Sequence, residues 1–153
     1  QLDLGLTTVM HHFPTKVSLL AAVLSQEDAA DTDFLERSAR DGFIPTVLAI
    51  VERNIARREL VRMFTVVQAE ATHAGHEAHE WLRQRYASVI PDYRDAIEHD
   101  RAAGRLTTTA DATMLADLVI GTWEGIQVRW LADGTDPVAA MRVALDALLT
   151  PRE

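Results

Sequence analysis

The chain has no cysteine and is very poor in lysine. The absence of cysteine among its 153 residues excludes disulfides and thiolate metal sites, and it fits a reducing compartment. Lys16 is the one lysine, and the net charge is -8 at pH 7. Because phosphate contacts need lysine and arginine gathered on one face, this balance argues against a general nucleic-acid binder.

Long hydrophobic runs, strand patterns and catalytic motifs are also missing from the sequence. No window approaches the roughly 18 consecutive apolar residues of a transmembrane helix, so we expect a cytoplasmic protein without a membrane partner. The sequence has neither a phosphate-binding Gly-Lys-Ser/Thr loop nor a Gly-x-Ser-x-Gly nucleophile turn. We therefore expect no enzyme, no catalytic residue and no cofactor.

Apolar residues recur at helical spacing along most of the chain, which predicts an all-α fold. Local signals mark the helix ends. Pro45 suits a first turn, Gly104 follows a last turn, and Asp136 with Pro137 is a strong start signal. Thr107, Thr108 and Thr109 supply an N-cap for the predicted helix that starts at Ala110. The expected helices are Thr15 to Gln26, Phe43 to Ile55, Glu59 to Thr72, Glu77 to Ala103, Ala110 to Ala132, and Pro137 to Leu149.

The N-terminal string from Thr7 to Lys16 carries the most specific signal. Pro14 disfavours the α conformation at Phe13, and Thr15 can cap a new helix, so a helix, a tight break and a second helix are predicted. The hydrogen-bonding side chains around this break could meet a phosphate backbone. The alternative is an ordinary corner between two surface helices.

The run Met10-His11-His12-Phe13-Pro14-Thr15-Lys16, followed by Leu19 and Leu20, resembles the end of the DNA-binding domain of the tetracycline-repressor (TetR) family. In that family the recognition helix ends on an aromatic-x-His-Phe-Pro-Ser/Thr-Lys signature, with Tyr usual where this chain has Met10. The resemblance implies that residues 1–26 form the C-terminal part of a helix-turn-helix DNA-binding domain. Residues 27–153 would then be a helical ligand-binding and dimerisation domain.

The resemblance also assigns roles at the DNA. Thr7 and Thr8 could touch base edges; by resemblance, Thr8 and His11 would face the groove, while His12, Thr15 and Lys16 would position the phosphate backbone. The family's turn glycine stands about two residues further from the phenylalanine than Gly5 does. We therefore expect a short segment to be missing after Gly5, and the first helices of the domain, with their basic residues, before Gln1.

The last two predicted helices carry more apolar surface than one core contact requires. In the TetR family these helices pair between subunits in a four-helix bundle, which implies a homodimer. The alternative is an ordinary core within one chain. The residues predicted at the dimer interface are Trp123, Gln127, Trp130, Ala140, Ala144 and Ala147.

Aromatic residues on helices that should face one another predict a pocket for a mostly apolar or amphipathic ligand. Glu70 and Gln127 are the candidate polar anchors. For each single residue, simple core packing is the alternative. The predicted lining is Met63, Phe64, Val67, Glu70, Trp81, Tyr86, Tyr93, Trp123 and Gln127.

A metal-binding alternative comes from Glu70, His73, His76 and His79, which follow one another at steps of three. Imidazoles could bind zinc or nickel weakly. A second Glu-x-x-His, which a carboxylate-bridged di-iron bundle needs, does not occur, so a solvated histidine-rich turn is the other interpretation.

Together these features predict a ligand-responsive transcriptional regulator. It would bind a double-stranded DNA operator as a homodimer and act as a repressor that a small apolar or amphipathic effector releases. The alternatives are a helical metal-binding protein and a plain dimerisation module.

Overall fold

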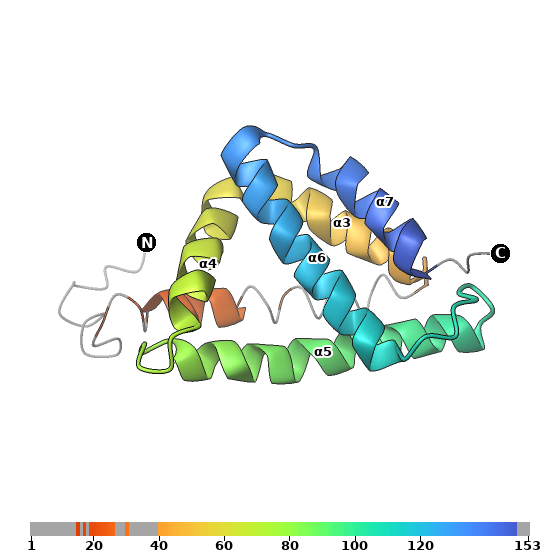
Figure 1. The fold of residues 1–153 in the computed structure, drawn as a ribbon, viewed down its shortest axis with the longest axis horizontal. Coiled ribbons are helices and arrows are strands. Elements are labelled where there is room, and N and C mark those ends of the chain that lie inside the picture. Colours follow the sequence, from red (N-terminus) through yellow and green to blue (C-terminus); the bar gives the residue numbers. More distant parts are fainter. Residues whose placement is uncertain (1–14, 16, 18, 27–29, 31–39, 150–153) are drawn as a thin grey trace, which may run out of the picture.

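The computed structural model describes residues 15, 17, 19–26, 30 and 40–149, and the predicted all-α fold is confirmed there. These residues contain helices and turns but no strand. A short helix covers residues 19–26, and five longer helices follow it (Figure 1). Within the described part of the chain, no helix combines the length and apolarity needed to cross a membrane. The longer helices are α3 (Phe43–Ile55), α4 (Arg58–Ala71), α5 (His79–Ala102), α6 (Ala112–Asp133) and α7 (Pro137–Leu149).

Local capping signals set several of these boundaries. Gly104 follows α5 with φ of 70°, and Gly134 closes α6 with φ of 77°, a conformation that favours glycine. The carboxylate of Asp136 accepts hydrogen bonds from the N–H groups of Val138 and Ala139 at the start of α7. Gly104 and Asp136 therefore act where the sequence predicted them.

The start of α6 differs from the prediction. The helix begins at Ala112 and its cap is Asp111, whose Oδ1 accepts a hydrogen bond from the Met114 N–H at 2.8 Å. The threonines at 107–109 precede this cap. A carboxylate suits the positive end of the helix dipole better than a hydroxyl does, which accounts for the later start.

The start of α3 is held by a residue from another helix. Gly42, at the N-cap with φ of 95°, has no side chain to offer. Oδ2 of the buried Asp100, on α5, accepts the Phe43 N–H at 2.7 Å instead. Oδ1 of Asp100 accepts two hydrogen bonds from the Arg105 guanidinium, at 2.6 and 2.9 Å. This carboxylate thus fixes the ends of α3 and α5 to one another.

Helices α3, α5, α6 and α7 share the main core. Helix α6 crosses α5 and packs along α7, and α7 in turn packs against α3 (Figure 1). Each fully buried aliphatic side chain adds about 1.5–3 kcal/mol relative to an exposed one. The most deeply buried members of the core are Val51, Ile97, Ala116, Val119, Met141, Leu145 and Leu149.

A second, smaller cluster joins the short N-terminal helix to the corner between α4 and α5. Val67 and Ala71 of α4 and Leu82 of α5 are buried there, and Val17 and Leu20 pack against them. At the same corner Trp81 Nε1 donates a hydrogen bond to Ser25 Oγ at 3.0 Å. The N-terminal helix is therefore attached to the fold through the α4–α5 corner.

Candidate ligand pocket

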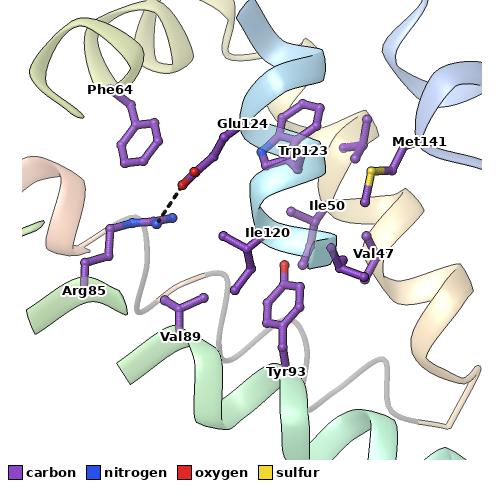
Figure 2. A pocket seen from close by; sticks show the side chains of 12 residues that line it. Val47, Ile50, Phe64, Arg85, Val89, Tyr93, Ile120, Trp123, Glu124 and Met141 are labelled. Atoms are coloured by element: carbon purple, nitrogen blue, oxygen red, sulfur yellow. Dashed lines mark ion pairs between the residues drawn. The ribbon is translucent and has the colours of Figure 1, made fainter. Parts of the chain in front are cut away.

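A pocket of about 410 Å³, part of it open to solvent, lies between α3, α4, α5, α6 and α7 (Figure 2). Aliphatic and aromatic side chains supply most of the wall, and one arginine and one glutamate are the charged residues in it. The lining consists of Val47, Ile50, Val51, Phe64, Arg85, Val89, Tyr93, Val119, Ile120, Trp123, Glu124 and Met141.

The apolar part of the pocket is built on rigid helix faces. Tyr93 of α5 packs its ring edge-on against Phe43 of α3, with ring centroids 5.7 Å apart and an angle of 86°. In Figure 2, Val47 and Met141 lie on the same side of the pocket as Trp123. An apolar ligand body would meet mainly the hydrocarbon parts of these side chains.

The charged part lies at the other side, beside Phe64 (Figure 2). Arg85 Nη1 lies 3.9 Å from Glu124 Oε1, and the two side chains are 15% and 19% exposed. The guanidinium also lies over the Phe64 ring, 4.5 Å from its centroid, a favourable cation–π geometry. The pocket therefore has one side lined by aliphatic and aromatic side chains and one side that carries an arginine and a glutamate.

Tyr86 and Gln68 support this pair from outside the pocket lining. Tyr86 Oη donates a hydrogen bond to Glu124 Oε1 at 2.9 Å, and Gln68 Nε2 donates to Tyr86 Oη at 2.8 Å. Burial, and next the negative charge of Glu124, raise the pKa of Tyr86 to about 12. The phenol consequently keeps its proton at neutral pH and continues to hold the carboxylate.

Three of the residues predicted to line the pocket do so, namely Phe64, Tyr93 and Trp123. Met63 is exposed, and Val67 belongs to the second cluster. Trp81 reaches the pocket only indirectly, because its ring packs edge-on against Phe64 with the ring centroids 6.2 Å apart.

The two predicted polar anchors lie elsewhere. Glu70 is exposed and lies 3.8 Å from the Nε2 of His76. Gln127 is 1% exposed, and its Nε2 has no hydrogen-bond partner among the described residues, but it does not line the pocket. The charged side chains that line the pocket are instead Arg85 and Glu124.

The sequence contained a signal for both of these missed residues. Arg85 stands four residues after Trp81 and four before Val89, so it shares the apolar face of α5. Glu124 likewise stands four residues after Ile120 on α6. A charged residue within an apolar helical stripe indicates a buried charge that has a partner, because burying a charge without one is costly.

Most of the residues predicted at the dimer interface are covered by their own chain. Gln127 and Trp130 are 1% and 6% exposed. Trp130 packs under the Arg58 guanidinium at 4.9 Å, and Trp123 lines the pocket. Ala140 and Ala144 are half-buried, and Ala147 is exposed. Thus Gln127 and Trp130 belong to the interior of one subunit, because the apolar stripe of α6 that contains them faces inward.

Of the residues predicted to contact DNA, Thr15 alone is described. Its hydroxyl donates a hydrogen bond to Glu77 Oε2 at 2.7 Å, at the α4–α5 corner. Thr7, Thr8, His11, His12 and Lys16, like Gly5, lie outside the described residues.

The three histidines of the metal alternative lie in or beside the turn between α4 and α5. Nδ1 of His73 accepts the Gly75 N–H, and Nδ1 of His76 accepts the Ala78 N–H. Nδ1 of His79 pairs with the Ala71 carbonyl oxygen at 2.8 Å. Within residues 40–149 and the few described before them, no three His, Asp or Glu side chains gather as metal ligands do. Each of these imidazoles contacts the backbone of the turn or the adjoining helix end through Nδ1.

Comparisons of the chain with protein-family models, with curated proteins and with solved structures found no match.

Proposed function

We propose that this chain is the ligand-sensing and dimerising part of a DNA-binding transcriptional regulator, released from its operator by a small amphipathic molecule. Two features support the proposal. The N-terminal signature ending at Lys16 resembles a DNA-binding domain, and the pocket has the amphipathic lining that a sensor requires. The observation that carries the sensing role is the contact between the pocket wall and the N-terminal helix.

That contact passes through three side chains. Phe64, in the pocket wall, packs edge-on against Trp81, and Trp81 donates its indole hydrogen bond to Ser25 on the N-terminal helix. A ligand that moves Phe64 therefore shifts a side chain bonded to the helix next to the DNA-binding segment. The ligand releases DNA only to the extent that it binds the DNA-incompetent arrangement more tightly.

An exposed apolar stripe on α6 supports the homodimer. Met114, Leu118 and Val128 are solvent-exposed on the same face as Gly121 and Gly125, in a pattern of alternating four- and three-residue steps. A Cβ placed on either glycine would meet nothing within 4 Å, so another helix can approach this face closely. A second copy of the same stripe is self-complementary about a two-fold axis. Val143 adds a further exposed apolar side chain on α7.

The dimer is tested with Leu118→Glu, which places a charge in the stripe. The matched control is Val66→Glu, because Val66 is a similarly exposed apolar residue on α4. Light scattering after size-exclusion chromatography should give the mass of a dimer for the parent and the control, and that of a monomer for Leu118→Glu. Equal masses for all three proteins would exclude this face as the dimer interface.

The regulator itself is tested by fluorescence anisotropy with the intact-length protein and the DNA just upstream of its own coding region. Binding should be tight, salt-sensitive and stronger than binding to unrelated DNA. Lys16→Ala should reduce the slope of log affinity against log salt by about 1, whereas the exposed Arg83→Ala should leave it unchanged. Absence of any DNA affinity in the intact-length protein would refute the proposed function.

A further inference from the structure

The exposed stripe of α6 is symmetric about the middle of the helix. Gly121 and Gly125 stand two positions on either side of residue 123, and the exposed Leu118 and Val128 stand five positions on either side. Because α6 spans Ala112–Asp133, residue 123 also lies at its centre. The stripe therefore has the same spacing in both chain directions.

Two such stripes can meet in two orientations about a two-fold axis. In an antiparallel pair centred on residue 123, Gly121 lies level with the partner's Gly125, and Leu118 lies level with the partner's Val128. In a parallel pair each residue lies level with its own copy. Both orientations bring the glycines together, so the apolar stripe alone does not choose between them.

The charged residues at the edges of the stripe do choose. Asp117 and Arg129 are exposed and stand six positions on either side of residue 123. They lie about 120° apart around the helix, so they flank the stripe on opposite edges. A parallel pair puts Asp117 level with its own copy and Arg129 with its own, and like charges at an interface are unfavourable. The antiparallel pair puts Asp117 level with the partner's Arg129 at both ends.

The ends of α6 favour the same orientation. The residues that pair within the helix keep their bonds, since Arg129 Nε still donates to Asp133 Oδ2 at 3.1 Å. An antiparallel copy brings the positive start of one helix, at Ala112, beside the negative end of the other, at Asp133. A parallel copy would align the two dipoles and bring Asp133 level with its own copy.

We propose that two copies of this chain join through antiparallel α6 helices centred on residue 123, with Gly121 against the partner's Gly125. The inference rests on the homodimer of the proposed function and specifies the orientation of its second subunit. The two-fold axis then runs across α6 at its middle. This axis relates the two N-terminal helices, and hence the two DNA-binding segments that precede them.

Disulfide cross-linking of the full chain tests the orientation, and the absence of native cysteine removes any background. The proteins are Leu118→Cys, Val128→Cys and the double variant, oxidised at low concentration after light scattering has given their masses in the reduced state. In the antiparallel pair a cysteine at 118 faces one at 128, whereas identical positions lie about 15 Å apart along the axis, too far for a disulfide. The double variant should therefore give at least about tenfold more covalent dimer than either single variant. Val66→Cys, on the exposed face of α4, measures cross-linking by random collision.

Each other outcome has its own meaning. Covalent dimer from Leu118→Cys alone or Val128→Cys alone, above the Val66→Cys level, would show a parallel pair and refute the inference. A dimer mass with no cross-link in the double variant would place the interface elsewhere and refute it too, while the proposed homodimer stands. A monomer mass for the parent chain would refute the homodimer and the inference together.

A charge reversal gives a second measurement that needs no disulfide. Asp117→Arg places an arginine level with the partner's Arg129, so it should weaken the dimer about threefold or more, and less so at high salt. In a parallel pair the same change only replaces one like-charge contact by another. The control is Asp95→Arg, which changes the net charge equally at an exposed carboxylate of α5. Equal dissociation constants for the two variants, measured by sedimentation, would contradict the antiparallel pair.

Discussion

Asp100 caps a helix that begins 57 residues before it in the chain, by accepting the Phe43 N–H at 2.7 Å. The same carboxylate holds Arg105, and its side chain is 5% exposed. Asp100→Ala leaves a buried N–H at the start of α3 and an arginine without its carboxylate partner. Losses of this kind cost about 2–4 kcal/mol, which we expect to measure as a lower free energy of unfolding in urea.

The matched control for Asp100→Ala is Asp95→Ala, also on α5, because the Asp95 carboxylate is 69% exposed and pairs only with its neighbour Arg94 among the contacts described. Its change should stay within about 0.5 kcal/mol. Equal losses in the free energy of unfolding of the two variants would show that the cap from Asp100 makes no particular contribution to stability.

Two glycines with positive φ should differ in their response to alanine. Gly134 has φ of 77° and open space around its missing Cβ, so Gly134→Ala costs only the backbone strain, about 1 kcal/mol. A Cβ on Gly42 would lie 3.1 Å from Asp100 Oδ2, in addition to a φ of 95°. Gly42→Ala should therefore lower the thermal midpoint more than Gly134→Ala does. The opposite order would mean that the carboxylate moves aside freely.

The raised pKa of Tyr86 links stability to alkaline pH. Because the folded-state pKa is about 12 and the ordinary value is 10, the folded protein holds this proton more tightly than the unfolded chain does. The stabilisation is complete below pH 10 and is lost as pH rises from 10 through about 12. The variant Tyr93→Phe keeps Tyr86 as its one tyrosine, and ultraviolet titration of its phenolate should show ionisation near pH 12. Ionisation near pH 10 in this variant would contradict the expected stabilisation of the protonated phenol.

The hydrogen bond between Trp81 and Ser25 is expected to transmit the ligand signal. Trp81→Phe and Ser25→Ala each remove it, and each should raise the ligand concentration needed to release DNA while changing ligand affinity at the pocket little. Because both variants remove the same bond, the double variant should be no worse than either single one. Additive effects in anisotropy titrations would indicate that the two residues act separately.

Helix positions were predictable because their signals are local. The expected and observed boundaries agree at Phe43–Ile55 and at the last helix, and they differ by one or two residues at each end of α4, α5 and α6. Pro45 and Asp136 act within a turn of where they stand, so no tertiary information is needed to interpret them. The cap of α3 could not be predicted in this way, because its acceptor, Asp100, lies on another helix.

The pocket was only partly predictable, for a related reason. Aromatic residues such as Tyr93 and Trp123 are natural candidates for both core and pocket, and the packing of helices α3 to α7 decides between the two. Trp81 and Trp130 are tryptophans like Trp123, but Trp81 packs on the second cluster and Trp130 packs under Arg58. Arg85 and Glu124 lie one on each of two helices, and their pairing follows from the crossing of α5 and α6, which periodicity does not reveal.

The three tryptophans occupy three separate environments, so the chain carries its own optical reporters. Trp81 bonds the N-terminal helix, Trp123 lines the pocket, and Trp130 lies beneath Arg58. Indole emission depends on local polarity and on quenching neighbours. Proteins that retain a single tryptophan would therefore report ligand entry, movement at the α4–α5 corner and opening of the core as distinct spectral changes, without an attached dye.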